Sequence, residues 1–318
     1  MMLVQRIKLE DLVCMEDPED VFEECKRLLF LMFPNYSQQP LEKAFEHVRG
    51  LFLGRCPGYF RCNTRYHDLK HTTDCLMALI RLIHGAHRTG VQMEEGMVTL
   101  ALITALMHDT GYVQTADDVS GTGAKYTLNH IERSICFMKE YFDAQGYSAQ
   151  EFAACRDILR CTGLDVQMTE IRFQSGEHEM LGMMLGASDL LGQMADRTYL
   201  ERLPFLFQEF KEGGVPGFES ELDLLRKTPG FWEFTKKRFE TQLGNVDRYM
   251  LHHFLTRWGI DSDLYREAIE NNISYLKYIL EQHPDNYSDY LRRGGLIKLL
   301  RERQFRADTR GEACKGEE

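Results

Sequence analysis

The spacing of apolar residues has the period of an α-helix along almost the whole chain. Apolar side chains recur at intervals of three and four residues, and no segment alternates regularly as a half-buried strand would. The sequence therefore predicts an all-α fold. The expected helices run over about 19–33, 40–53, 66–88, 93–109, 127–144, 148–161, 177–195, 196–212, 230–257, 263–283 and 287–303. Proline is scarce, and Pro34, Pro204, Pro216 and Pro229 are expected between helices.

The length and composition predict one domain rather than several. The 318 residues are 43% hydrophobic, which suffices for one large core, since single cores stop growing at roughly 250–300 residues. We expect a single all-helical domain over 1–305. The remaining segment 306–318, RADTRGEACKGEE, has little to bury and is expected to be disordered.

Charge and cysteine usage limit the partners and the compartment. The formal net charge of -11 disfavours nucleic-acid binding, because an acidic surface repels a phosphate backbone. No apolar run approaches the roughly 20 residues of a membrane span, and the first residues, MMLVQRIKLEDL, lack the apolar stretch of a secretory signal. The nine cysteines form no C-x-x-C pair and indicate reduced thiols. We therefore expect a cytoplasmic protein that binds neither nucleic acid nor membrane; the oligomeric state stays open.

One helix is expected at the centre of the fold. The segment from Met97 to Asp109 is apolar nearly all the way round, and Gly111 just beyond it favours a helix end. The polar, glycine-containing stretch 115–126 follows directly and is a candidate lid or substrate-contacting loop. A second loop is expected over 211–221.

Histidine and aspartate residues form an ordered set on different expected helices. His71, the pair His108-Asp109 and Asp189 lie on three long helices, and Asp189 stands in a small and apolar stretch, LGASDLLGQMADR. A carboxylate there costs several kcal/mol unless it is paired or bound to a metal. Imidazole and carboxylate together suit a divalent transition metal, and Asp109 has a second oxygen that can bridge to a second ion. Such a site supports hydrolysis of a phosphoester.

Two further groups are expected close to this set. His67 stands four residues before His71 in YHDLKHTTD, which would place both on one face of a helix. Asp74 follows on that face and is expected to orient His67 or His71 as an outer carboxylate.

These segments resemble the HD superfamily and, within it, the cyclic-nucleotide phosphodiesterases. YHDLKHTTD is similar to the family pattern YHNxxHAxD, LMHDTGY to HDxxH, TLNHIERSICFMKEYF to the ENHH helix and DILRCTGLDVQM to ILATDMxxH. GASDLL resembles CADLS, and PGFWEFTKKRF resembles PLWETW. The matches follow the family's order between about 60 and 245. The resemblance implies a compact multi-helix bundle with a metal site in its helical core.

The resemblance also implies roles for individual residues. It makes His71, His108, Asp109 and Asp189 the metal ligands, His67 the general acid, and His130 a water or phosphate contact beside the second metal. The expected catalytic residues are thus His67, Asp109 and His130. The expected cofactors are one or two divalent ions, Zn, Fe, Mn or Mg. The expected reaction is attack of a metal-bound hydroxide on a small phosphorylated substrate, such as a cyclic nucleotide.

The chain departs from the family pattern at two places. Where the phosphodiesterases carry HDxDHPG, this chain has HDTGYVQ, so Tyr112 stands in place of the second histidine. The SQxxF segment, whose glutamine binds the purine base, has no counterpart around 217–228. These departures leave the second metal and the cyclic-nucleotide specificity open.

Three alternatives stay open on the sequence alone. They are a 5'-nucleotidase-type phosphomonoesterase of the same superfamily, a di-iron oxygenase that would need His130 and His178 as further ligands, and a non-catalytic protein with a structural metal. The remaining histidines are expected outside the site. His84 and His87 should face solvent near the end of their helix, and the pair His252-His253 has no expected role. The phenylalanine-rich stretch 205–210 is expected to serve packing.

Overall fold

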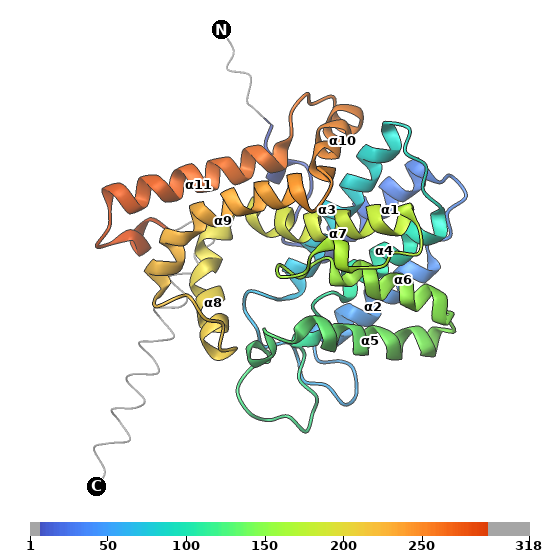
Figure 1. Cartoon of the computed structure of the whole chain (residues 1–318), viewed down its shortest axis with the longest axis horizontal. Coiled ribbons are helices and arrows are strands. Elements are labelled where there is room, and N and C mark those ends of the chain that lie inside the picture. Colours follow the sequence, from blue (N-terminus) through green and yellow to red (C-terminus); the bar gives the residue numbers. More distant parts are fainter. Residues whose placement is uncertain (1–6, 292–318) are drawn as a thin grey trace.

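Residues 7–291 are described by a computed structural model, and they form a bundle of α-helices (Figure 1). The eleven α-helices of this part of the chain are α1 (Pro18–Met32), α2 (Gln39–Phe52), α3 (Leu69–Arg88), α4 (Glu95–Met107), α5 (His130–Gln145), α6 (Ala149–Arg160), α7 (Gly176–Ala195), α8 (Tyr199–Glu212), α9 (Glu221–Thr241), α10 (Tyr249–Trp258) and α11 (Leu264–Gln282). The all-α prediction is confirmed. The division into one domain over 1–305 stays a prediction.

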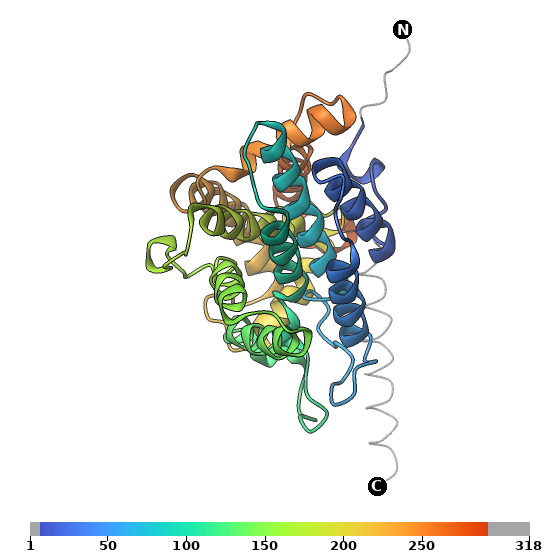
Figure 2. The ribbon, with the colours of Figure 1, turned by 90° about the vertical axis from the view of Figure 1, so that its right-hand side faces the viewer.

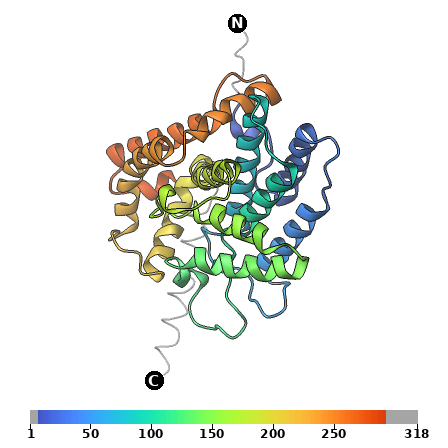
Figure 3. The same ribbon diagram turned by 45° about the vertical axis from the view of Figure 1, so that its right-hand side comes forward.

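Helix α3 organises the core. It packs against α7, α10, α1 and α4, and every residue from His71 to Ala86 is buried. Figure 3 shows α7 near the middle of the bundle, and Figure 2 shows α1 and α2 along one edge. Helix α4 is buried from Val98 to Met107. This confirms the prediction for the apolar segment that precedes His108.

A glycine allows α3 to approach α10 closely. A Cβ atom on Gly85 would lie only 1.9 Å from the carbonyl oxygen of Tyr249. Gly85→Ala must therefore push the two helices apart. We expect the free energy of unfolding to fall by about 1–3 kcal/mol, as for other overpacked cores. Denaturant titration measures this change.

The matched control is Gly96→Ala in α4, where an added Cβ would meet no atom within 4 Å. Removing backbone freedom from the unfolded chain should leave this variant unchanged or more stable by up to about 1 kcal/mol. Equal losses at Gly85 and Gly96 would contradict the close approach of α3 and α10.

The prediction of one long helix over 230–257 is wrong, because parts of both α9 and α10 occupy this stretch. Helix α9 ends at Thr241 and α10 begins at Tyr249. Gly244 and Asn245 between them have φ angles of 57° and 52°, in the left-handed region that interrupts a right-handed helix.

Two prolines expected between helices lie inside them. Pro204 is within α8 and Pro229 within α9. Each removes one backbone hydrogen bond, but both helices continue. Pro204 is buried, and the packing of its helix outweighs the local preference.

The helix expected over 66–88 begins later, at Leu69. Asp68 is its N-cap, and the Asp68 carboxylate accepts a hydrogen bond from the backbone N–H of His71 at 3.0 Å. Aspartate at this position satisfies a donor that the first turn leaves free. His67 therefore precedes the helix, and its expected position one turn before His71 on the same helix face is wrong.

The expectations for the last helix, the tail, the cysteines and membrane spans can be compared with the structure only within residues 7–291. The helix expected over 287–303 is seen as a 3₁₀ turn at Tyr287–Tyr290, and the rest of it lies outside the described residues, as does the tail 306–318. The eight cysteines among residues 7–291 are free thiols. Each helix in this part of the chain is too short or too polar to cross a lipid bilayer.

Candidate functional site

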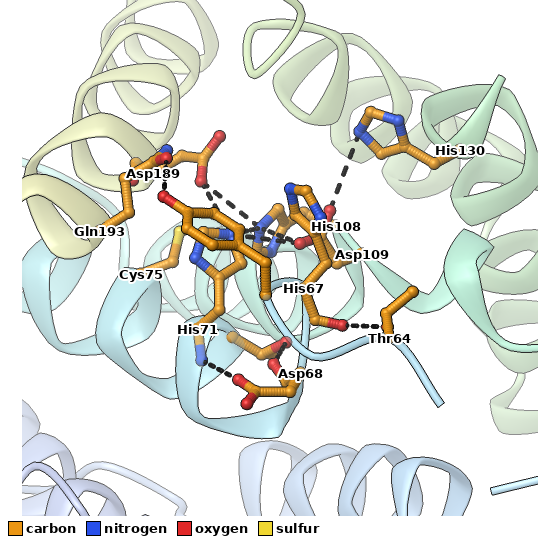
Figure 4. A network of polar contacts seen from close by, with 12 residues as sticks. Thr64, His67, Asp68, His71, Cys75, His108, Asp109, His130, Asp189 and Gln193 are labelled. Carbon is orange, nitrogen blue, oxygen red and sulfur yellow. Dashed lines mark hydrogen bonds and ion pairs between the residues drawn. The ribbon is translucent and has the colours of Figure 1, made fainter. Parts of the chain in front are cut away.

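Three helices bring four metal-ligand atoms together. His71 comes from α3, His108 and Asp109 from the C-terminal end of α4, and Asp189 from α7 (Figure 4). His71 Nε2 lies 3.1 Å from Asp109 Oδ2 and 3.1 Å from Asp189 Oδ1. His108 Nε2 lies 3.3 Å from the same Asp109 oxygen, 3.7 Å from the same Asp189 oxygen and 3.4 Å from His71 Nε2. His71 and His108 thus lie against each other, and each contacts both Asp109 and Asp189.

The protonation of His108 leaves a lone pair facing this cluster. Its Nδ1 lies 2.7 Å from the carbonyl oxygen of Ala105, an acceptor, so Nδ1 carries the proton and Nε2 of the neutral ring does not. The facing oxygens, Asp109 Oδ2 and Asp189 Oδ1, are buried and accept no hydrogen bond that meets normal geometry from residues 7–291. Two buried carboxylate oxygens and a ring lone pair this close together repel one another unless a cation lies among them, either a proton on His71 Nε2 or a metal ion. The donor set therefore fits a divalent metal ion.

Burial and mutual attraction act against each other in the pKa values of the cluster. Burial lowers the pKa of His71, but its contacts with Asp109 and Asp189 outweigh that effect and raise the pKa to about 10. Burial likewise raises the pKa values of the two carboxyl groups, and the neighbouring histidines bring both below the usual range. The two aspartates are therefore carboxylates at neutral pH, and His71 holds a proton between them that a bound metal ion would have to replace.

His67 stands at the edge of the cluster and is fixed by Glu209. Its Nδ1 lies 2.7 Å from Glu209 Oε2, and its ring lies 5.4 Å from that of His71 between ring centres. Burial raises the pKa of Glu209, but His67 and the backbone N–H groups of Arg65 and Tyr66 lower it below its usual range. An ionised Glu209 accepts the Nδ1 proton and leaves His67 Nε2 free. A ligand atom of His67 lies within 4.8 Å of those of His71 and Asp109, so geometry alone also admits His67 as a ligand.

Helix α8 holds the segment before α3 through two buried charged residues. Glu209 Oε1 accepts hydrogen bonds from the backbone N–H groups of Arg65 and Tyr66, both at 2.7 Å. Arg202 donates to the Asp68 carboxylate at 2.9 Å. Glu209 was not among the predicted site residues and lies in the stretch 205–210 that was expected to serve packing. A carboxylate within the apolar sequence PFLFQEF was the available signal.

His130 reaches the other oxygen of Asp109. Its Nε2 lies 3.8 Å from Asp109 Oδ1, while its Nδ1 lies 2.7 Å from the carbonyl oxygen of Thr127. Tyr112 stacks on the rings of both His67 and His130, with ring centres 4.4 Å and 4.8 Å apart. The residue that departs from the phosphodiesterase pattern therefore lies against both histidines as an aromatic support.

The loop 115–126 lies beside the segment that leads to His67. Phe60 N–H donates to the Gln114 carbonyl oxygen, and Ala116 N–H donates to that of Gly58. Figure 1 shows the two loops projecting together beyond α5. Asp118 is bonded to Lys125 and Tyr126 within the loop. The loop is present as predicted, and its role as a lid stays a prediction.

Asp74 does not orient either histidine. Its Oδ2 accepts a hydrogen bond from Lys70 at 2.7 Å, and its Oδ1 is buried without a partner. Residues three apart on a helix point about 60° away from each other, which turns Asp74 aside from the cluster that His71 faces. The predicted orienting role is wrong.

Two other histidines, His84 and His178, lie away from the cluster. His84 is buried, not exposed, and its Nδ1 lies 3.2 Å from Nδ1 of His253 on α10. His178 lies in the first turn of α7, eleven residues before Asp189, which corresponds to about 16 Å along the helix axis.

Glu209→Gln tests how His67 is held. Glutamine keeps the shape, but its oxygen is needed by two backbone N–H groups, which turns its NH₂ towards His67 Nδ1. We expect the ring proton to move from Nδ1 to Nε2, as ¹⁵N NMR of the histidine ring will show. The free energy of unfolding should fall by about 1–3 kcal/mol, the worth of a hydrogen bond to a charged group.

The control is Glu212→Gln, one turn further along α8, where the carboxylate bonds to Thr122 instead. This variant should leave the His67 tautomer unchanged. An unchanged tautomer in Glu209→Gln would show that Glu209 does not fix the ring.

Comparison with known proteins gives one partial match. Residues 117–247 match the profile of a family described as Npun_R2479-like. The matched stretch is less than half of the chain and includes His130 and Asp189 but not His71, His108 or Asp109. No curated protein and no solved structure matches the chain.

Proposed function

We propose that this protein is a metal-dependent phosphohydrolase that cleaves a phosphoester. The observation that carries the proposal is the meeting of His71, His108, Asp109 and Asp189, with two buried carboxylate oxygens that accept no hydrogen bond. The motif resemblance to the HD superfamily supports the same ligand set. Three packed helices supply these groups, and His71, His108 and Asp109 are buried in the core.

A divalent ion bound by these ligands would supply a nucleophile by lowering the pKa of water and would polarise a phosphoryl oxygen. The protein's own groups supply orientation and a proton. His67 is half-buried at the edge of the cluster, with Nδ1 bound to Glu209 and Nε2 available. In the protonated state, His67 Nε2–H is placed to donate a proton to the leaving oxygen. Glu209 holds the ring through Nδ1 and acts as a positioning residue.

The position of His130 beside Asp109 favours binding of a second ion or of a phosphate oxygen there. It faces Asp109 Oδ1, the oxygen that the four-residue cluster does not use. Burial lowers the pKa of His130, with opposition from Asp109, so its ring is neutral at pH 7 and able to bind a cation. We therefore propose one ion at the four-residue cluster and, through His130, a weaker second position.

A phosphodiester, such as a cyclic nucleotide, is the first substrate class to test, and a 5'-nucleotide is the second. A di-iron oxygenase is disfavoured, because His178 lies about 16 Å along α7 from Asp189 and therefore cannot complete a shared ligand set.

The test combines metal analysis with a substrate panel on one preparation. Elemental analysis should find at least one divalent ion per chain. After chelation, Mn, Zn, Fe or Mg should restore hydrolysis of bis-nitrophenyl phosphate, a cyclic nucleotide or a 5'-nucleotide. A metal-loaded protein that hydrolyses none of these substrates and consumes dioxygen would favour the oxygenase. Metal without either activity would indicate a structural ion.

A further inference from the structure

A second cavity lies beside α3, away from the described cluster. It has a volume of about 690 Å³ and is bordered by the segment 8–16, α3, the end of α7 and α11. This volume is in the range of small-molecule sites. Its lining is partly apolar, with Val13, Met15, Leu264 and Ala268 among the residues that face it.

The most buried charged group of the cavity is an incompletely satisfied carboxylate. Asp74 is 4% exposed and lines the cavity. Its Oδ2 accepts a hydrogen bond from Lys70, whereas Oδ1 has no hydrogen-bond partner among residues 7–291. A buried carboxylate oxygen without a donor is costly, and an ionised donor supplied by a ligand would relieve that cost.

The neighbouring charges leave this carboxylate poorly neutralised. Lys70 Nζ lies 2.7 Å from Asp74 and 3.2 Å from Asp196, so one ammonium group is shared by two buried carboxylates. Burial raises the pKa of Asp74 to about 7 in spite of Lys70. The two basic residues near the rim, Lys8 and Arg197, both lie within 4 Å of Glu10. Arg202, which is not among the lining residues, also acts on Asp74 and Asp196. The lining itself has five acidic residues and three basic ones, so the cavity carries an excess of negative charge.

We propose that this cavity binds a small organic cation, a primary ammonium compound with an apolar body, whose ammonium group is held by Asp74. The ammonium pairs with the Asp74 carboxylate in the cavity wall, and the apolar body packs on Val13, Leu264 and Ala268. The site is separate from the proposed phosphoester site, and the inference does not depend on that function.

The position of the cavity places the ligand next to two helices of the cluster. Asp74 follows His71 by one turn of α3. On α7, Gly192 follows Asp189 by one turn, and a Cβ atom on Gly192 would lie 2.9 Å from the backbone of Asp74. The experiment must therefore separate binding in the cavity from binding at the cluster.

Calorimetric titration with cyclohexylmethylamine, and with cyclohexylmethanol as its neutral counterpart, tests the proposal. We expect the amine to bind the full chain at least tenfold more tightly than the alcohol. Asp74→Asn should weaken amine binding at least tenfold. The same substitution at Asp157, a buried carboxylate paired with Arg156 on α6, should leave binding unchanged.

Two further variants keep the test decisive. Ala268→Phe places a large side chain in the cavity and leaves the Asp74 carboxylate in the chain. This variant should also abolish binding, which decides the matter if Asp74→Asn does not fold. Asp109→Ala alters only the cluster and should bind the amine normally. Equal affinity for amine and alcohol, or amine binding that survives both Asp74→Asn and Ala268→Phe, would overturn the proposal. Loss of binding in Asp109→Ala would assign the amine to the cluster instead.

Discussion

Asp109→Ala is expected to lose bound metal and phosphoester hydrolysis together. Asp109 Oδ2 lies 3.1 Å from His71 Nε2 and 3.3 Å from His108 Nε2, and its Oδ1 faces His130. It is thus the carboxylate placed to reach both proposed ion positions. Changes to residues that merely support metal ligands cost 10–100-fold in metal affinity, so loss of this ligand should cost more than about 100-fold. Elemental analysis and the hydrolysis rate measure the two effects.

The effect of added metal on the free energy of unfolding is an independent test of the same variant. A metal that binds only the native state should stabilise the parent protein by about 2.7 kcal/mol at a concentration 100 times the dissociation constant. Added metal should leave Asp109→Ala almost unaffected. The control is Asp143→Ala, an exposed carboxylate on α5, which should respond to metal as the parent does. Full metal content in Asp109→Ala would exclude the proposed ligand set.

The meeting of His108, Asp109 and Asp189 with His71 could be anticipated because these residues carry local signals in the sequence. His108-Asp109 ends an apolar helix, and Asp189 is a carboxylate in an apolar stretch, so each is costly unless it has a partner. The all-α fold followed from periodicity for the same reason, since burial of one helix face leaves its pattern in the sequence. What the sequence could not supply was how these helices lie against one another.

Glu209 shows where local reasoning stops. It follows His67 by 142 residues, and only the placement of α8 against the segment before α3 brings them together. The start of α3 was easier to predict from the sequence than this contact. Asp68 is a favourable N-cap residue, and an N-cap at Asp68 leaves His67 outside the helix. For His84, nearness to the helix end suggested exposure, but α10 packs over that turn and buries it against His253. Tertiary contacts of this kind leave no local pattern.

His67→Ala is expected to keep the metal and lose rate in proportion to the basicity of the leaving group. Glu209 holds His67 through Nδ1, which leaves Nε2 to supply a proton at the edge of the cluster. Loss of one positioned acid typically costs about 10²–10⁴-fold. A cyclic nucleotide or another alkyl ester has a leaving oxygen that needs protonation and should show the full loss. A nitrophenyl phosphodiester has a leaving group that needs little, and it should be hydrolysed nearly as fast by the variant as by the parent.

The ratio of the two rates, measured beside metal content, separates the roles that the geometry admits for His67. If His67 is a ligand, as its closeness to His71 and Asp109 allows, metal content and both rates fall together. If it serves only packing, the free energy of unfolding falls and both rates change by one factor. His47→Ala is the matched control, because His47 is also half-buried and its ring packs on Phe137 and Tyr141, away from the cluster. This variant should leave the ratio unchanged. Equal loss on both esters with metal retained would refute the acid role, because a missing proton donor must cost more where the leaving group is more basic.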